Sequence, residues 1–172
     1  MTQEEIDFKD NLEHIMQNKE KYAILDTETT GLGKNDEIIE ISILGLDGTV
    51  LLDTYVKPSI PVSKGAYDVH KIENSTLENA PSWPEVWPQV EVVLKGKRLI
   101  AYNAKFDVRM IQQSCKNHNI EEPFLRYLCM MELVMEWKGF RPKLEHFASG
   151  TQEHRALADC KIILEDIILK NL

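Results

Sequence analysis

The dipeptide Asp47-Gly48 constrains the fold of this chain most strongly. It separates two apolar stretches, Glu37 to Leu46 and Val50 to Val56, and Asp-Gly in that setting is typical of the tight turn of a β-hairpin. A third apolar stretch, Tyr22 to Asp26, precedes the pair. We therefore predict three strands near the start of the chain, at least two of them antiparallel.

The rest of the chain follows a different pattern. Residues 57–88 hold five of the seven prolines, so we expect loops with short helices there. Beyond them, strand and helix patterns alternate. We predict strands at 98–102 and 126–129, and helices at 4–18, 85–94, 105–117, 131–137, 142–147 and 156–169. This order predicts an α/β fold in which helices flank a mixed five-stranded sheet.

Composition excludes several classes of protein. No apolar run approaches the ~20 residues needed to span a bilayer, and the N-terminus is acidic where a secretory signal would be basic. We therefore expect a cytoplasmic protein without a membrane partner. The three cysteines are widely spaced and odd in number, which favours buried free thiols over disulfides or a zinc cluster. They are Cys115, Cys129 and Cys160.

The formal net charge of −8 is unevenly distributed. Residues 1–20 contain six acidic residues against Lys9 and Lys19, so half of the net charge lies in this segment. Four metal-binding carboxylates would account for the remaining −4. The charge argues against a long duplex footprint, which would need a broad face of lysines and arginines.

Two acidic residues stand at the end of the first predicted strand. Residues i and i+2 of a strand share a face, so Asp26 and Glu28 can both point at one cation while Ile24 and Leu25 anchor the strand. Read alone, the same residues could form a charged turn closed by Gly31. A metal site here needs partners elsewhere in the chain.

A second candidate group lies where the strand at 98–102 gives way to a helix. Asn103 is well suited to cap that helix, and Asp107 projects from its first turn on the side of the strand's end. Asp107 could equally be an ordinary acidic residue favoured by the helix dipole.

The third candidate group is His154 and Asp159. Five residues correspond to roughly 500° of α-helix, so the two side chains cannot share one face of a regular helix. They converge only if His154 lies on the loop that enters the helix. The alternative is an exposed histidine before an ordinary amphipathic helix.

Together the three segments resemble the DEDDh branch of the DnaQ-like 3′→5′ exonucleases, which includes polymerase proofreading subunits, ribonuclease T and oligoribonuclease. The matching motifs are Asp-x-Glu-Thr-Thr-Gly at 26–31, Tyr-Asn-Ala-x-Phe-Asp at 102–107 and His-x4-Asp at 154–159. The connecting segment with Val69-His70-Lys71-Ile72 is also similar, whereas Tyr102 stands where many members carry histidine. We expect an exonuclease domain at 21–172 with an appended helix or arm at 1–20.

The resemblance implies a ribonuclease H-like fold and hydrolysis with two divalent metal ions, Mg²⁺ or Mn²⁺. It implies that Asp26 bridges both ions, that Glu28 and Asp159 bind the first, and that Asp107 binds the second. His154 is implied as the general base, because an imidazole titrates near neutral pH. The expected product is a nucleoside 5′-monophosphate released from a 3′ end.

The resemblance also suggests how substrate is held. The terminal nucleotide should lie against Thr29, Thr30 and Leu32, with Asn103 and Phe106 near the next unit; core packing remains the alternative for Leu32 and Phe106. Several basic side chains close to the histidine motif in sequence could contact phosphates or could form a solvated loop. These are Lys138, Arg141, Lys143 and Arg155.

Three functions follow from these observations. The leading prediction is a 3′→5′ exonuclease on single-stranded DNA or frayed 3′ ends, which a polymerase could recruit. An exoribonuclease that trims RNA ends or short oligonucleotides is the alternative, because recognition of the 2′-hydroxyl depends on pocket shape. A non-catalytic polymerase accessory module is disfavoured by the complete set of acidic residues and histidine.

Overall fold

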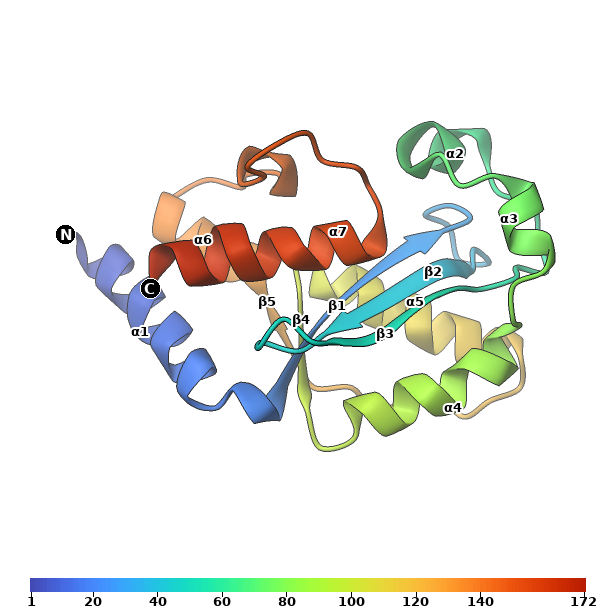
Figure 1. Cartoon of the computed structure of the whole chain (residues 1–172), viewed down its shortest axis with the longest axis horizontal. Coiled ribbons are helices and arrows are strands. Elements are labelled where there is room, and N and C mark those ends of the chain that lie inside the picture. Colours follow the sequence, from blue (N-terminus) through green and yellow to red (C-terminus); the bar gives the residue numbers. More distant parts are fainter.

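Five strands form the sheet at the centre of the computed structural model, which describes residues 1–172 (Figure 1). Their order across the sheet is β3-β2-β1-β4-β5. β1 pairs with β2, and β2 with β3, in antiparallel fashion, while β1–β4 and β4–β5 are parallel pairs. The mixed five-stranded sheet is therefore confirmed. The strands are β1 (Tyr22–Thr29), β2 (Ile38–Leu44), β3 (Val50–Tyr55), β4 (Arg98–Ala101) and β5 (Tyr127–Cys129).

Helices cover both faces of the sheet (Figure 1). The helices that pack on these faces are α1 (Gln3–Gln17), α4 (Trp83–Leu94), α5 (Ala104–Asn117), α6 (Met130–Lys138) and α7 (Ala156–Lys161). Alternating side chains of β1 contribute to the cores on both faces, since Ala23 and Leu25 pack with α4 and α5, whereas Tyr22 and Ile24 pack with α1, α6 and α7. The other helical segments are α2 (Lys64–His70), α3 (Asn74–Glu78) and the 3-10 turns η1 (Lys19–Lys21), η2 (Leu144–His146) and η4 (Leu169–Asn171).

The hairpin between β2 and β3 forms at the predicted turn. Gly48 has a φ of +84°, and its N–H donates to the Gly45 carbonyl at 2.9 Å. The Thr49 N–H donates to the Asp47 carboxylate at 3.0 Å. A glycine at this position avoids the strain that a side chain would meet at positive φ.

Some predicted helix boundaries were wrong. The helix expected at 142–147 is only the 3-10 turn η2. α4 begins at Trp83 rather than residue 85, because Ser82 and Glu85 form a capping box. α7 continues into a π-helix, η3 (Ile162–Ile168), whose hydrogen-bond pattern has no distinct apolar signature.

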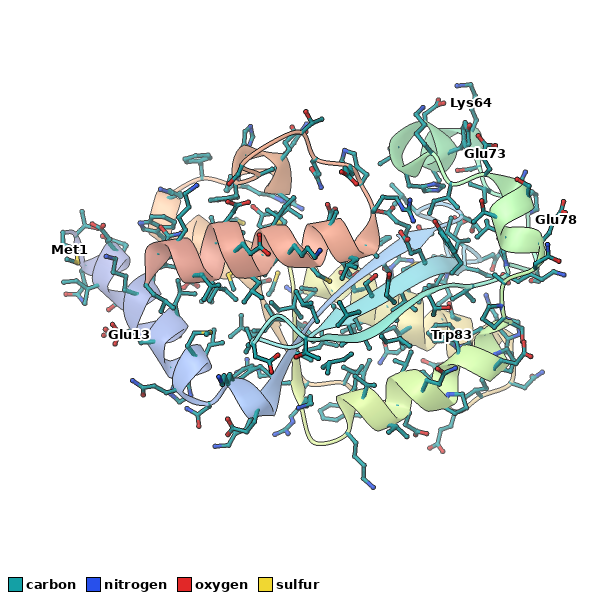
Figure 2. All side chains as sticks on the ribbon, in the orientation of Figure 1. Met1, Glu13, Lys64, Glu73, Glu78 and Trp83 are labelled. Carbon is teal, nitrogen blue, oxygen red and sulfur yellow. The ribbon has the colours of Figure 1, made fainter.

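α1 packs through one apolar stripe. Phe8, Leu12 and Ile15 are buried, whereas Ile6 is exposed. The spacing of four and then three residues places the buried side chains on one face, and acidic residues such as Glu13 project from α1 into solvent (Figure 2).

All three cysteines are buried free thiols, as predicted. Trp83 and Trp87 form a buried face of α4 with ring centroids 5.8 Å apart. None of the helices combines the length and the apolar character required to cross a bilayer.

Candidate active site

Three carboxylates from two elements meet beside β1. Oxygens of Asp26, Glu28 and Asp159 lie within 4.8 Å of one another. Asp26 and Glu28 share one face of β1, and α7, which carries Asp159, packs on that face. We call these three residues the carboxylate cluster.

Asp107 approaches from α5 and is held differently. Its Oδ1 accepts a hydrogen bond from the Thr27 hydroxyl at 2.8 Å. Thr27 lies between Asp26 and Glu28 in sequence and therefore points to the opposite face of the strand. Asp107 is close enough for its charge to act on Asp26, but it is not one of the three groups that meet directly.

Burial and mutual repulsion raise the pKa values of all four acidic groups. Loss of solvent is the largest cause in each, followed for Asp26 by the charges of Asp107 and Asp159. The pKa of Glu28 rises to about 9, that of Asp107 to about 7 and that of Asp159 to about 6. Four ionised carboxylates therefore repel one another strongly without a cation.

The donor atoms present fit a divalent cation. Asp159 Oδ2 accepts a hydrogen bond from the Gln152 amide at 2.7 Å, but its buried Oδ1 has no hydrogen-bond partner. An unpaired buried carboxylate oxygen is costly and calls for a ligand. Hard oxygen donors from two or more carboxylates are the ligands that Mg²⁺ and Mn²⁺ prefer.

His154 lies on the loop that precedes α7, and this part of the prediction is confirmed. Its φ of +50° is in the left-handed region, which is uncommon for a residue with a side chain. Burial raises the pKa of Asp159, whereas the Gln152 hydrogen bond and the charge of His154 act in the opposite direction. The charge of the imidazole therefore acts on the carboxylate cluster, although His154 is not one of the groups that meet directly.

A pocket of about 370 Å³ opens next to Glu28. Leu32 lies at this pocket with 78% of its surface exposed, so core packing does not explain it. Phe106 packs against the core on one side and lines the pocket on the other. The eleven lining residues are Thr27, Glu28, Thr29, Gly31, Leu32, Ser63, Gly65, Ala66, Val69, His70 and Phe106.

Thr30 and Asn103 do not line this pocket. Thr30 is fully buried, and its hydroxyl donates to Asp36 at 2.7 Å and accepts the Glu37 N–H at 2.9 Å. Asn103 occupies the N-cap position of α5, but its side chain makes no capping bond, so the predicted side-chain cap is wrong. The Phe106 N–H instead donates to the main-chain carbonyl of Asn103.

Sequence reasoning missed the contribution of α2. The buried His70 accepts the Ile72 N–H at Nδ1, and its Nε2 has no hydrogen-bond partner. With Nδ1 an acceptor, the proton of the neutral ring belongs on Nε2. A helix of seven residues is too short to show apolar periodicity, and only the similarity of residues 69–72 pointed to it.

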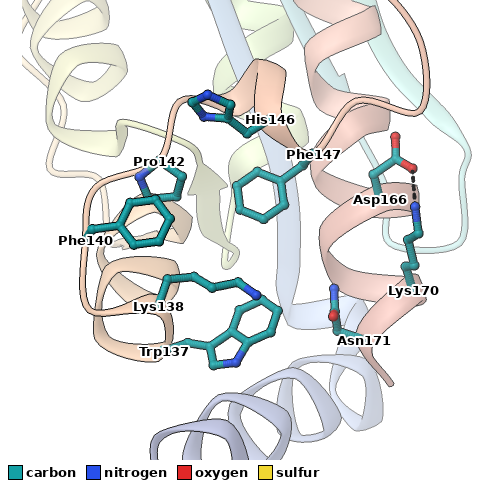
Figure 3. A pocket seen from close by; sticks show the side chains of 9 residues that line it. All are labelled: Trp137, Lys138, Phe140, Pro142, His146, Phe147, Asp166, Lys170 and Asn171. Carbon is teal, nitrogen blue, oxygen red and sulfur yellow. Dashed lines mark ion pairs between the residues drawn. The ribbon is translucent and has the colours of Figure 1, made fainter.

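The basic residues close to the histidine motif make separate contacts. Arg155 is paired with Glu40, and Lys143 lies 3.4 Å from Glu145. Lys138 lies 3.4 Å above the Trp137 ring, in a separate pocket of about 550 Å³ between α6 and the end of the last helix (Figure 3). None of the predicted catalytic, metal-binding or nucleotide-binding residues lines that pocket.

Comparisons with known proteins agree with this geometry. An uncharacterized exonuclease of Escherichia phage 186 is 31% identical over 160 residues, which cover 81% of this chain and 82% of the phage protein. A PolC-type DNA polymerase III of Caldanaerobacter subterraneus is 33% identical over 86% of this chain but only 11% of the polymerase. The structure of exonuclease X with 5′ overhanging duplex DNA superposes with a TM-score of 0.64 and 27% identity, over 86% of this chain and 89% of that one.

The family assignment rests on most of the chain. The model of the RNase_T family, described as exonuclease, matches residues 23–166, and these residues contain every element of the site. The motifs, the sheet order and the carboxylate cluster agree with that match. The chain therefore belongs to the exonuclease family and is a DEDDh-type 3′→5′ exonuclease domain with a ribonuclease H-like fold.

Proposed function

We propose that this exonuclease acts on the 3′ ends of single-stranded DNA or frayed duplexes and releases nucleoside 5′-monophosphates one at a time. The observation that carries the proposal is the carboxylate cluster, with its unpaired Asp159 oxygen, directly beside an open pocket. DNA is favoured because the relatives named above are a polymerase and a nuclease bound to DNA.

We propose that Asp26, Glu28 and Asp159, together with Asp107, would hold two divalent cations. When bound, Mg²⁺ or Mn²⁺ would supply Lewis-acid activation and neutralise charge that develops on the phosphodiester. The Thr27 hydroxyl holds Asp107 in place through the hydrogen bond described above. The raised pKa values support the proposal, because a cation would relieve the repulsion among these groups.

His154 is the proposed general base. A neutral imidazole can accept a proton from the attacking water and release it to solvent, since the side chain is only half-buried. The carboxylate of Asp159 lies near enough to stabilise the imidazolium that forms.

The pocket beside Glu28 is the proposed site for the terminal nucleotide. Leu32 and Phe106 both line this pocket and offer apolar surface to a base, and such contacts tolerate any base sequence. Gly31 leaves room for the turn, because a Cβ there would lie 2.7 Å from the Asp36 carboxylate. Thr30, which is bonded to the same Asp36, is proposed to shape this loop rather than to touch the nucleotide.

Degradation of matched 5′-labelled strands tests the proposal. Single-stranded DNA, duplex DNA and RNA of one sequence are incubated with Mg²⁺ and the wild-type protein, Asp26→Ala or the surface control Glu13→Ala. A ladder that shortens from the 3′ end of single-stranded DNA, lost only in Asp26→Ala, is expected. A ladder on RNA alone would show that RNA rather than DNA is the substrate. Intact strands in every reaction would refute the proposal.

A further inference from the structure

Arg155, the residue after His154, is held by a network that the proposed reaction does not use. Its Nε donates to both carboxylate oxygens of Glu40, at 3.1 and 3.2 Å, and its Nη2 donates to Oε1 at 2.6 Å. Nη2 also donates to the Tyr55 hydroxyl, and the guanidinium lies 5.2 Å from the centre of that ring. Such a bidentate pair fixes orientation as well as distance.

Glu40 is the buried partner in this network. Its side chain is 5% exposed, and its Oε2 also accepts the Ala156 N–H at 3.0 Å. One side chain on β2 therefore holds both Arg155 and the first residue of α7, the helix that carries Asp159. The ion pair links the central sheet to the start of that helix.

Glu40 is also a fifth carboxylate close to the cluster. It pairs with Glu28 across β1 and β2 in the strand register. Both of its oxygens are already occupied by Arg155 and Ala156, so neither is free to bind a cation. Because Arg155 occupies it, Glu40 is not available as a metal ligand, unlike the three residues of the carboxylate cluster.

The chain before Arg155 has few other attachments. Residues 148–154 make no hydrogen bond between main-chain groups. Side chains tie this segment down at Ser149, which bonds Asp166, and at Gln152, which bonds Asp159. The left-handed conformation of His154 is intrinsically unfavourable and persists only where neighbouring contacts impose it. The contacts nearest in sequence are those that Arg155, the next residue, makes with Glu40 and Tyr55.

We propose that Arg155 is a positioning residue, which together with Glu40 and Tyr55 sets the conformation of His154 beside the carboxylate cluster. The inference rests on the proposed function, because it gives His154 the role of base. Arg155 itself neither lines the nucleotide pocket nor hydrogen-bonds to the cluster's oxygens. Its positive charge also acts on Glu28, and Arg155→Lys keeps that charge, whereas the positioning of His154 acts through the main chain that the two residues share.

A double-mutant cycle separates positioning from a general structural role. Arg155→Lys keeps the charge but loses the bidentate geometry, and Arg98→Lys at the far end of the sheet is the matched control. In the wild-type background, Arg155→Lys should lower kcat at least tenfold, with KM and Mn²⁺ affinity within twofold of wild type. In the His154→Ala background, the same substitution should change kcat less than twofold. Arg98→Lys should have no effect in either background.

Wild-type turnover in Arg155→Lys would overturn the inference, as would an equal loss in both backgrounds. A second measurement does not depend on activity. Order parameters of the main-chain amides of residues 150–155, from ¹⁵N relaxation, should fall in Arg155→Lys and stay unchanged in Arg98→Lys. Unchanged order parameters in Arg155→Lys would refute positioning even if hydrolysis could not be detected. If the wild-type protein were inactive but Arg155→Lys showed the expected loss of order, only the proposed function would be contradicted.

Discussion

Burial determines the chemistry of the individual acidic residues. Asp107 is 3% exposed, and desolvation raises its pKa to about 7 despite the hydrogen bond from Thr27. A carboxyl group with a higher pKa in the folded than in the unfolded state binds more protons when folded. The metal-free protein should therefore lose stability as the pH rises from about 4, where the unfolded group ionises, to about 7, where the folded group does.

Asp107→Asn should remove the free-energy cost of ionising a buried carboxyl group, while leaving an oxygen to accept the Thr27 hydrogen bond. We expect the free energy of unfolding of the metal-free protein at pH 8 to rise by roughly 1–3 kcal/mol, with little change below pH 4. Urea denaturation with a chelator, at both pH values, measures the difference. A variant less stable than wild type at pH 8 would show that the carboxylate stabilises the fold.

His154→Ala and Asp159→Asn should have different effects. Loss of the base should lower the catalytic rate by ~10²–10⁴ while divalent-ion affinity stays nearly unchanged. Asp159→Asn should lower the affinity for the divalent ion, because Asp159 carries the unpaired buried oxygen. Single-turnover rates and calorimetric titrations of the two variants provide the comparison. If both variants lost ion binding equally, His154 would not act as a base separate from the metal ligands.

The acidic residues could be predicted from the sequence, but the pocket could not be predicted in full. Asp26 and Glu28 follow from the two-residue period of a strand, and His154 from the impossibility of sharing a helix face with Asp159. His70 and Ala66 come from α2, a helix too short to have a periodic pattern. The burial of Thr30 depends on its bonds to Asp36 and Glu37, which the linear motif does not reveal.

At the scale of elements, α1 forms part of the core. The family match starts at residue 23, yet Phe8 stacks on Trp137 of α6 with ring centroids 4.4 Å apart. Leu12 and Ile15 are buried in the same cluster as residues of α6 and α7. We propose that residues 1–20 are an appended structural helix that covers one face of the exonuclease domain, whose removal would expose this apolar surface.

Phe8→Ala should lower the free energy of unfolding by about 3–5 kcal/mol, the usual cost of truncating a buried aromatic side chain. Turnover of the folded fraction should not change, because Phe8 contacts α6 rather than the site. Ile6→Ala is the control on the exposed side of the same helix and should cost under about 0.5 kcal/mol. Denaturation of both variants gives the contrast; a similar cost for the two would mean that α1 is not held by this stripe.

The order of elements was predictable, whereas their ends were not. Asp47-Gly48 and the apolar stretches beside it specify the hairpin, because turn and strand signals agree there. The 3-10 turn at Leu144–His146 and the π-helix at Ile162–Ile168 differ from an α-helix in their hydrogen-bond pattern. Neither kind of helix has an apolar period that a sequence would display.

At the scale of the whole molecule, the site depends on the order of the strands. β1 lies in the middle of the sheet, so helices on both faces can deliver acidic residues to its end, Asp107 from α5 and Asp159 from α7. Segments more than 130 residues apart in the chain therefore meet at one place. Glu13 of α1 lies outside this convergence and projects into solvent (Figure 2).

Calorimetric titration with Mn²⁺ tests most directly whether this convergence is a metal centre. The wild-type protein at pH 7.5, without nucleic acid, is compared with Asp26→Asn and with the surface control Glu13→Gln. The carboxylate cluster predicts saturable binding by the wild type and the control, and at least a tenfold loss of affinity in Asp26→Asn. Equal binding by all three proteins, or no binding by the wild type, would contradict it.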